Sequence, residues 1–473
     1  MKTLTNTSDP AKTAPRVAII GGGPGGLMTA YLLNRRAPSL TDITIFEADL
    51  RVGGKIVTKQ FDRATAIYEA GTAELYDYSR VGFDPLRQLV THLGLPTRPL
   101  AGETVVLNNL FLKTDADVRR QLGDQTWKAL QEFRRQARSL ISPLDYYESD
   151  WKEAGNNPLV TENFDKFLSR IPDRAARRCV EIIVHSDVAT EPEHTNAMYG
   201  LQNYLMNDPD YMQLYTIVGG IERLPKELAR RTQARILINQ PVVRVEATQD
   251  GGYRILSRSR GEVVADEFDF VVAALPNNWL LNIEWAGSLA DVMRRHHARY
   301  DHVAHYLRVS ILFKQPFWRH IVAESYFMLD AFGGCCVYDE SSRHRGNSHG
   351  VLGWLLAGEA ALTMSNFNDD ALIERVLDSI SPQLGYRRQW FVEGRVHRWV
   401  GSVNGLPGGC CAGDANSRHL PDPVRHSGLL VVGDYLFDST LNGLFDSADL
   451  AAEHITDEAL GRSNLVVAQR KAA

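Results

Sequence analysis

The sequence has little cysteine, no long apolar run and almost no excess charge. Its five cysteines in 473 residues include two adjacent pairs, Cys335-Cys336 and Cys410-Cys411, which form neither a disulfide framework nor the C-x-x-C spacing of a metal site. No uninterrupted apolar run approaches ~20 residues, and the first fifteen residues are polar. We therefore expect a reducing compartment, no membrane span and a cytoplasmic protein without a bound metal.

The charge balance points to a small-molecule partner. Lys and Arg number 52 against 57 Asp and Glu, a net charge of −5, which does not favour nucleic acid or an anionic membrane as the main partner. With 44% hydrophobic and 23% charged residues, the chain has a globular composition and a length of roughly two to three domains. The sequence thus predicts a large buried core.

The first recognisable unit is a strand, a glycine-rich turn, a helix and a second strand. The β-branched run Val17–Ile20 is typical of a buried parallel strand, and Gly21–Gly26 follows it directly. Residues 27–33 supply the apolar face of a helix, and Ile43–Phe46 forms the next apolar run. This order predicts one βαβ unit.

The turn in this unit fits a dinucleotide-binding fingerprint. In Gly21-x-Gly23-x-x-Gly26, the first glycine permits the tight turn, the second lets the backbone approach a diphosphate, and the third lets helix and strand pack closely. The phosphates then lie at the helix N-terminus. Glu47 ends the second strand, 21 residues after Gly26, where an acid can bind ribose hydroxyls. The alternative is a glycine-rich turn with a surface glutamate.

The later sequence predicts two interleaved domains. Apolar strands recur at Phe268–Leu275 and Leu429–Val432, whereas residues 114–140 are strongly helical and residues 291–393 do not repeat the βαβ rhythm. We expect an α/β protein, with a Rossmann-type nucleotide-binding domain and a discontinuous α+β substrate domain. The expected ranges are a leader at 1–14, the nucleotide-binding domain at 15–90, 215–290 and 395–460, the substrate domain at 91–214 and 291–394, and a tail at 461–473.

Arg51-Val-Gly-Gly-Lys55, just after Glu47, carries a family resemblance. Together with the glycine turn it resembles the flavin-containing amine oxidase superfamily, in which G-x-G-x-x-G and an acid precede R-x-G-G-R; here Lys55 stands for the last arginine. That superfamily includes monoamine, polyamine and L-amino-acid oxidases, protoporphyrinogen oxidase and phytoene-type desaturases. Further similar segments are Tyr215–Pro225 with Val242–Val245, Asp269–Pro276, Leu312–Trp318, and Gly433–Asp434 with Gly443–Ala448.

The resemblance implies FAD as the cofactor. It implies that Val243 contacts adenine through its backbone, that Asp434 meets the ribityl-phosphate region, and that a helix beginning near Leu444 faces the flavin N1/O2 edge. A helix N-terminus there would stabilise the negative charge of reduced flavin. The implied cofactor-binding residues are Gly21, Gly23, Gly26, Glu47, Arg51, Gly53, Gly54, Lys55, Gly71, Thr72, Val243, Asp434 and Leu444. We expect non-covalent binding.

A covalent flavin link is the alternative. Monoamine oxidases attach flavin through the cysteine of an S-G-G-C-Y stretch, and this chain reads Pro407-Gly-Gly-Cys-Cys411 at a similar place. The spacing from Trp399 differs by about two residues, and Cys411 replaces the aromatic residue. Cys410 is therefore the candidate tether, and a packed free thiol is the ordinary alternative.

Two charged residues depart from the family pattern. Glu74, in Gly71-Thr-Ala-Glu74, replaces the arginine of G-A-M-R, and we hypothesise that it faces the active-site cavity and attracts a substrate ammonium. The alternative is a glutamate on a solvated turn, paired with an arginine. Arg308 aligns with the lysine near flavin N5; because arginine stays charged it cannot be a general base, but it can anchor water or an anion. It could instead cap a strand or pair with Asp301.

The aromatic pair that often encloses the amine is not clearly present. Cys411 and Thr440 align near its two positions, and Trp399 and Tyr435 lie close to them in sequence. His302 and His305 are further titratable candidates, although such histidines are more often structural. Glu74, Arg308 and Trp399 are the catalytic candidates.

Taken with the resemblance, these residues predict an FAD-dependent oxidase. Hydride would pass from a C–H next to an amine to flavin N5, the imine would hydrolyse to a carbonyl, and O2 would reoxidise the flavin to give H2O2. The substrate would be a small amine or amino-acid derivative, and a homodimer is left open. The alternatives are a desaturase or another biosynthetic oxidation, and a redox-inactive binding protein similar to the Rab GDP dissociation inhibitors.

Overall fold

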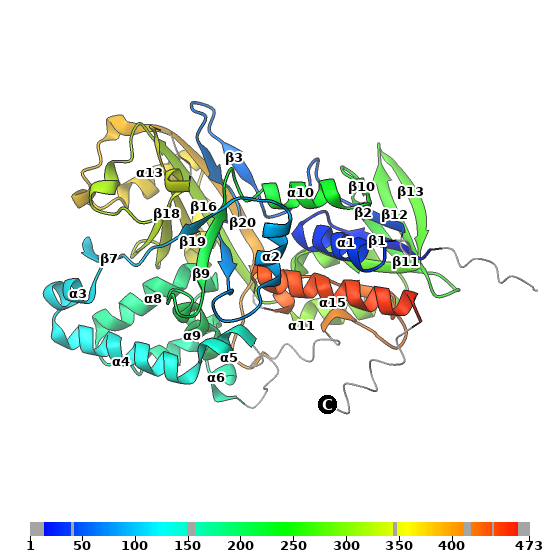
Figure 1. The fold of residues 1–473 in the computed structure, drawn as a ribbon, viewed down its shortest axis with the longest axis horizontal. Coiled ribbons are helices and arrows are strands. Elements are labelled where there is room, and N and C mark those ends of the chain that lie inside the picture. Colours follow the sequence, from blue (N-terminus) through cyan, green and yellow to red (C-terminus); the bar gives the residue numbers. More distant parts are fainter. Residues whose placement is uncertain are drawn as a thin grey trace, which may run out of the picture.

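The computed structural model describes residues 14–38, 42–148, 157–343, 348–410, 418–437 and 439–461. Two lobes lie side by side (Figure 1). One lobe combines the two ends of the described chain, drawn in blue and red, with green strands from its middle, and the other consists mainly of cyan, green and yellow elements. The chain therefore passes between the lobes several times.

A five-stranded parallel sheet forms the centre of the first lobe. In spatial order its strands are β10 (Arg235–Leu237), β2 (Asp42–Phe46), β1 (Arg16–Ile20), β14 (Phe270–Ala273) and β21 (Leu429–Val431). Both faces are covered, because alternate residues of β1 such as Ala18 and Ile19 belong to different apolar clusters. This explains why the strands read as continuous apolar runs.

Helices cover one face of this sheet and a second sheet covers the other. The helices are α1 (Pro24–Arg36), α10 (Arg223–Arg231) and α15 (Leu441–Ala459), which share one apolar cluster with α2 (Pro85–His92). The second sheet contains β13 (Glu262–Phe268), β12 (Tyr253–Ser259), β11 (Val242–Ala247) and β15 (Glu284–Trp285), with α11 (Ser288–Arg299) beside it. The layers are those of the Rossmann-type domain that the sequence predicts.

A seven-stranded sheet organises the second lobe. In spatial order it contains β20 (Phe391–Asn404), β16 (Val303–Phe313), β19 (Gly350–Ala357), β18 (Cys335–Asp339), β17 (Tyr326–Leu329), β7 (Val105–Leu107) and β8 (Leu110–Leu112). Two smaller sheets are β3 (Thr58–Gln60) with β4 (Ile67–Glu69), and β5 (Leu75–Asp77), β9 (Gln213–Ile217) and β6 (Thr97–Leu100). The helices of this lobe are α3 (Asp115–Leu122), α4 (Asp124–Leu140), α5 (Pro143–Glu148), α6 (Pro158–Thr161), α7 (Phe164–Leu168), α8 (Arg174–Val188), α9 (Ala197–Leu205), α12 (Gly358–Met364) and α13 (Asp369–Asp378).

Three details differ from the sequence expectations. The helical stretch 114–140 is two helices, because Gly123 adopts φ +93° between α3 and α4. The expected boundary at 394/395 falls inside β20, which pairs with β16 along nearly its whole length. The boundary at 290/291 falls inside α11, whose Leu289 and Met293 pack in the core of the first lobe. The division into two domains stays a prediction with these boundaries moved.

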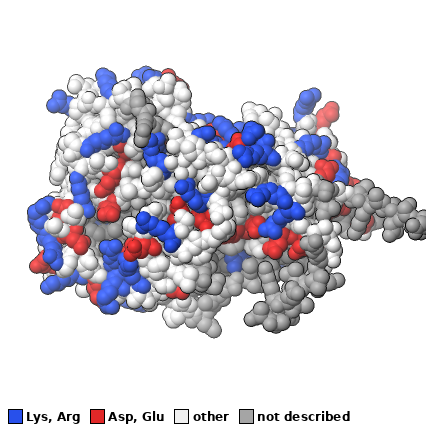
Figure 2. All heavy atoms as spheres, in the orientation of Figure 1, with Lys and Arg blue, Asp and Glu red and all other residues white. Residues whose placement is uncertain are grey.

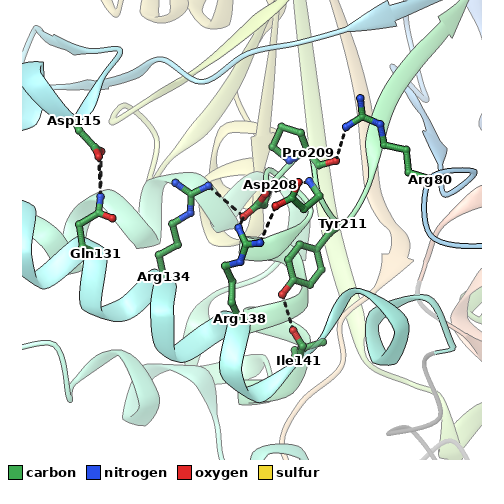
Figure 3. Close-up of polar contacts among 10 residues, drawn as sticks. Arg80, Asp115, Gln131, Arg134, Arg138, Ile141, Asp208, Pro209 and Tyr211 are labelled. Carbon is green, nitrogen blue, oxygen red and sulfur yellow. Dashed lines mark hydrogen bonds and ion pairs between the residues drawn. The ribbon is translucent and has the colours of Figure 1, made fainter.

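An ion-pair cluster fixes helix α4 to the segment after α9 (Figure 3). Arg134 and Arg138 place guanidinium nitrogens 3.2 and 2.8 Å from Asp208 Oδ2, and Arg138 also lies 2.7 Å from Asp210 Oδ2. The hydroxyl of Tyr211 donates to Ile141 O at 2.7 Å. Asp208 is thus a nearly buried acid with its charge compensated.

The surface carries both signs of charge. On the face drawn in Figure 2, basic and acidic side chains are interspersed over both lobes. Of the helices within the described ranges, none combines the length and apolar character that crossing a bilayer requires.

Candidate functional site

The glycine-rich turn after β1 is too tightly packed for side chains at two of its positions. A Cβ atom on Gly21 would lie 2.4 Å from Ala274 O, and Gly21 has φ +109°. A Cβ on Gly26 would lie 2.1 Å from Gly21 O. These contacts are far below van der Waals distance, so the turn and the start of α1 require glycine there.

The N-terminus of α1 is available to an anion. Gly23 is its N-cap and offers no side chain to the first N–H groups, and no acidic residue lies in the first turn. Nearby, Glu47 Oε2 accepts a hydrogen bond from Gly22 N at 2.7 Å, and Oε1 accepts one from Asp49 N at 2.8 Å. Burial raises the pKa of Glu47, and these backbone hydrogen bonds oppose that shift. An acid thus lies beside a free helix N-terminus.

The Arg51–Lys55 loop lies against this turn. Gly53 N donates to Gly22 O at 2.8 Å, and a Cβ on Gly23 would meet only Gly54 Cα, at 3.9 Å. The guanidinium of Arg51 donates to Gly54 O at 2.6 Å and to Val52 O at 3.1 Å, which holds the loop in shape. Space remains at Gly23 between two glycine-rich segments. These donors and this space fit a dinucleotide diphosphate.

Lys55 and Asp434 form an ion pair in the same region. Lys55 Nζ lies 2.8 Å from Asp434 Oδ2 and donates to Ser402 O at 2.9 Å. The lysine charge is therefore directed at Asp434.

One cavity of about 150 Å³ connects the start of α1 with the second lobe. It brings together many of the residues expected from the sequence, namely Lys55, Gly71, Thr72, Glu74, Arg308, Trp399, Asp434 and Leu444, with Pro24 of α1 at one side. Val243 lies outside this cavity, at a bulge where the register between β11 and β12 shifts. The remaining expected residues surround the glycine turn.

Glu74 faces the cavity, so the alternative of a solvated turn is wrong. Its Oε2 atom is buried without a hydrogen-bond partner among the described residues. Burial raises the pKa of Glu74, and hydrogen bonding with Tyr338 and the charges of Arg343 and Arg308 oppose the shift. A role for this carboxyl in catalysis remains a prediction.

Arg308 is fully buried in the middle of β16 and also lines the cavity. It does not pair with Asp301 or end the strand; its Nη2 pairs with Glu340, and its guanidinium lies 4.9 Å from the ring centre of Tyr338. Glu340 Oε2 also lies 3.4 Å from Arg343 Nη1. Nε and Nη1 of Arg308 have no hydrogen-bond partner in the described chain, so two donors remain for a cavity occupant.

Aromatic side chains form part of the cavity wall. Trp399 of β20 donates from Nε1 to Ala70 O at 2.7 Å, and it lies directly opposite Tyr306 of β16. Tyr76 and Tyr306 also line the cavity but were missed from the sequence. Tyr306 and Arg308 are two residues apart on one strand and so share a face, a signal that could have indicated Tyr306.

The other sequence candidates lie elsewhere. Cys410 Sγ is 3.1 Å from His302 Nε2, and Cys410 does not line the cavity. His305 Nδ1 accepts from Gly401 N at 3.0 Å, and burial lowers the pKa of both histidines. The hydroxyl of Tyr435 lies 3.2 Å from a ring nitrogen of buried His296. Cys411 lies outside the described residues.

The N-terminus of α15 opens onto the cavity. This helix begins at Leu441, three residues before the expected start near Leu444, because Thr440 caps it: Thr440 Oγ1 accepts from Gly443 N at 3.0 Å. Thr440, Leu441 and Leu444 line the cavity, and Leu444 packs on Gly25 of α1. The positive end of the helix dipole is therefore close to any cavity occupant.

No cluster of three or more His, Cys, Asp and Glu side chains suited to a metal ion occurs among the described residues.

Comparison with known proteins gives a consistent match. Residues 24–456 match the family described as flavin containing amine oxidoreductase. The chain is 24% identical over 418 residues to an L-amino-acid oxidase of Mus musculus, covering 84% of this chain and 62% of that protein. It is 18% identical to the L-amino-acid oxidase of Gloydius halys, again covering 62% of the relative. The chain thus spans about 62% of the length of these curated relatives.

Solved structures share the fold. A putrescine oxidase bound to putrescine has a TM-score of 0.72 at 21% identity, covering 93% of this chain and 98% of that one. Cyclohexylamine oxidase from Brevibacterium oxydans has a TM-score of 0.72 at 18% identity, covering 94% and 99%. At these identities the likeness shows the α/β fold.

Proposed function

The chain belongs to the flavin containing amine oxidoreductase family, and we propose that it is an FAD-dependent oxidase of a small amine. A C–H bond next to the nitrogen is broken, two electrons and the hydrogen leave as hydride, and the resulting imine takes up water to give a carbonyl and ammonia or a smaller amine. O2 accepts the two electrons and, with two protons, becomes H2O2.

The observation that carries this proposal is the single cavity that runs from the start of α1 to the second lobe. Pro24, at the start of α1, lines its first part, and the glycine turn, to which Glu47 is hydrogen-bonded, directly precedes this helix N-terminus. Its other part is lined by Glu74, Arg308 and Trp399. A cofactor held by the first lobe would therefore meet a substrate held by the second.

The chain's own residues supply binding and electrostatics for FAD. The N–H groups at the start of α1 would receive the diphosphate, Glu47 the ribose hydroxyls, and Asp434 the ribityl region. When bound, FAD supplies the two-electron acceptor that no side chain provides. The N-terminus of α15 would stabilise negative charge that develops near it. We propose non-covalent attachment, because Cys410 is directed at His302.

The polar and aromatic residues that line the cavity bind the substrate in this proposal. Amine oxidation needs the neutral amine, whereas an alkylamine arrives protonated. Glu74 is poised to accept this proton, because burial raises its pKa towards that of a useful base. Arg308, which stays protonated, cannot accept it and instead orients water or an anionic group through Nε and Nη1. Trp399 and Tyr306 form the wall.

Anaerobic mixing with a panel of amines and amino acids tests the proposal. The expected result is a yellow protein whose absorbance bleaches with an amine and returns with O2, with one H2O2 released per amine consumed. Bleaching without peroxide would favour the desaturase alternative, and a colourless protein that takes up no FAD would favour a binding protein. Mass measured after denaturation should equal that of the chain alone.

A Glu74→Gln variant tests the proton acceptor. It keeps the size of the side chain but cannot take the proton, so kcat should fall and its rise with pH should shift to higher pH. Glu103→Gln, at an exposed position outside the cavity, is the matched control. An unchanged pH profile and an unchanged KM for a diamine would remove the role of Glu74.

A further inference from the structure

A second chamber adjoins the cavity described above. It has a volume of about 60 Å³ and shares Tyr76, Tyr306, Val403, Ser439 and Thr440 with the first cavity, so the two lie directly next to each other. The far wall is polar and comes from the helical part of the second lobe. It comprises Tyr78, Tyr146, Asp187, Tyr199, Gln202 and Asn203.

Hydrogen-bond acceptors without partners face this second chamber. Asp187 Oδ2 and Gln202 Oε1 are buried and have no hydrogen-bond partner in the described part of the chain. Leaving a buried acceptor without a hydrogen bond destabilises the folded protein. Two such atoms on one chamber wall indicate that an occupant with hydrogen-bond donors completes it.

Asp187 differs from the other acids that line these cavities, because no cation among the described residues compensates its charge. The other two acids have partners: Asp434 pairs with Lys55, and Glu74 lies within the influence of Arg308 and Arg343. Asp187 forms no ion pair among the described residues. Asp208, on the same lobe, shows how a nearly buried carboxylate is usually compensated, because two arginines pair with it (Figure 3).

The position of Asp187 in its helix adds to this cost. It is the second-last residue of α8, at the C-terminal end, where the helix dipole favours a cation and disfavours a carboxylate. Burial and the nearby Glu74 raise the pKa of Asp187 well above its ordinary value, and hydrogen bonding with Asn207 and Ser186 only partly opposes this. Burial, helix dipole and acidic neighbour all disfavour its charge, and a bound cation would relieve all three.

We propose that Asp187 binds a second, cationic nitrogen of the substrate, so that the preferred substrates are diamines or polyamines. One amine of the substrate would lie in the first cavity with Glu74, Arg308 and Trp399. The methylene chain of the substrate would pass between Tyr76 and Tyr306, and its distal ammonium would reach Asp187 and Gln202. Tyr76 and Tyr306, which line both cavities, suit a methylene chain there, because aromatic faces bind both apolar groups and cations. This inference rests on the proposed amine oxidation.

The test compares an α,ω-diamine with the monoamine of the same chain length on the FAD-loaded protein. Asp187→Asn keeps the shape of the side chain and removes its charge. It should lower kcat/KM for the diamine by roughly 30-fold or more, as expected for loss of one partner of a buried charge pair. The kcat/KM for the monoamine should stay within about twofold of the wild-type value. Asp378→Asn is the matched control: Asp378 ends α13 of the same lobe, also at a helix C-terminus, but is exposed. This variant should keep the wild-type kcat/KM for both substrates.

Calorimetry of diamine binding to the FAD-loaded protein gives a readout that does not need turnover, provided that the flavin is first reduced with dithionite so that it cannot oxidise the diamine. An ammonium that pairs with a protonated Asp187 displaces its proton. The heat of binding should therefore depend on the ionisation enthalpy of the buffer in the wild type, which reports proton release. This dependence should be lost in Asp187→Asn. If the wild type binds the diamine with this signature but does not oxidise it, the oxidation proposal fails and the Asp187 site stands. Equal losses for both amines in Asp187→Asn, or no diamine preference and no proton release in the wild type, would overturn the site.

Discussion

Two glycines of the same turn, exchanged for alanine, should separate folding from cofactor binding. Gly23 and Gly26 are three residues apart, yet an added methyl meets different surroundings at each. At Gly23 the nearest atom is Gly54 Cα at 3.9 Å, and the backbone has φ −72°, which alanine adopts readily. At Gly26 the methyl meets Gly21 O at 2.1 Å.

The magnitudes follow from these contacts. Gly26→Ala gains up to about 1 kcal/mol of helix propensity. Because the methyl would meet a backbone oxygen at 2.1 Å, we expect a cost at the upper end of the range of about 1–3 kcal/mol for overpacking, and so a net loss of about 1–2 kcal/mol or more. Gly23→Ala should leave the stability of the flavin-free protein within about 0.5 kcal/mol. Its methyl would occupy the space beside the α1 N-terminus, and loss of one charge-assisted hydrogen bond to a phosphate is worth about 1.5–3 kcal/mol, or roughly 10- to 100-fold in Kd.

The assay has two parts. Urea unfolding of the flavin-free variants, followed by circular dichroism, measures the free energy of unfolding, and titration with FAD, followed by tryptophan fluorescence, measures Kd. Gly26→Ala should lose both stability and FAD affinity, and Gly23→Ala only affinity. Wild-type FAD affinity in Gly23→Ala would refute the position assigned to the diphosphate, and full stability of Gly26→Ala would refute the close packing of the turn.

Three further substitutions test the buried network and the cavity wall. Burial and nearby Glu340 raise the pKa of Glu69 to about 7. A carboxyl with a raised pKa favours folding below its unfolded pKa of 4.5, and it loses that contribution as the pH rises to about 7. Glu69→Gln should therefore remove a decline of about 3 kcal/mol in the free energy of unfolding over this window, which would appear as a flatter profile of that free energy against pH. Glu340→Gln leaves the nearly fully buried Arg308 and Arg343 without their acid and should lower the free energy of unfolding by about 3–5 kcal/mol; in urea titrations, a loss below about 1 kcal/mol would contradict the pairing. Trp399→Phe removes the hydrogen bond from the indole nitrogen, so unfolding should become easier by about 1 kcal/mol and kcat/KM for the amine should fall; unchanged kinetics would exclude Trp399 from the substrate wall.

The sequence predicted best what depends on local backbone geometry. The strand, turn and helix around Gly21 and Gly26 can be read from residue types alone, because few residues other than glycine tolerate such close contacts. The strands expected at Val17–Ile20 and Ile43–Phe46 match β1 and β2 to within one residue at each end.

What depends on distant partners could not be predicted in this way. The sequence left Glu74 open to a solvated turn, since the residues that interact with it, Arg308, Tyr338 and Arg343, all lie more than two hundred residues away. The sequence did not indicate a binding role for Asp187. A lone aspartate near a helix end cannot be told from a surface acid until the other residues that line the second chamber are known. That the expected boundary at 394/395 lies inside β20 could not be seen in the sequence either, because the pairing of β20 with β16 is non-local.

The most direct test of the central claim is the visible spectrum of the purified protein before and after anaerobic addition of a diamine. The account predicts a bound flavin spectrum that bleaches fully with the diamine and recovers when O2 is admitted, with an equal amount of H2O2. A protein that binds no flavin after incubation with FAD would contradict the dinucleotide site, and a flavin spectrum that no amine bleaches would contradict the proposed oxidation.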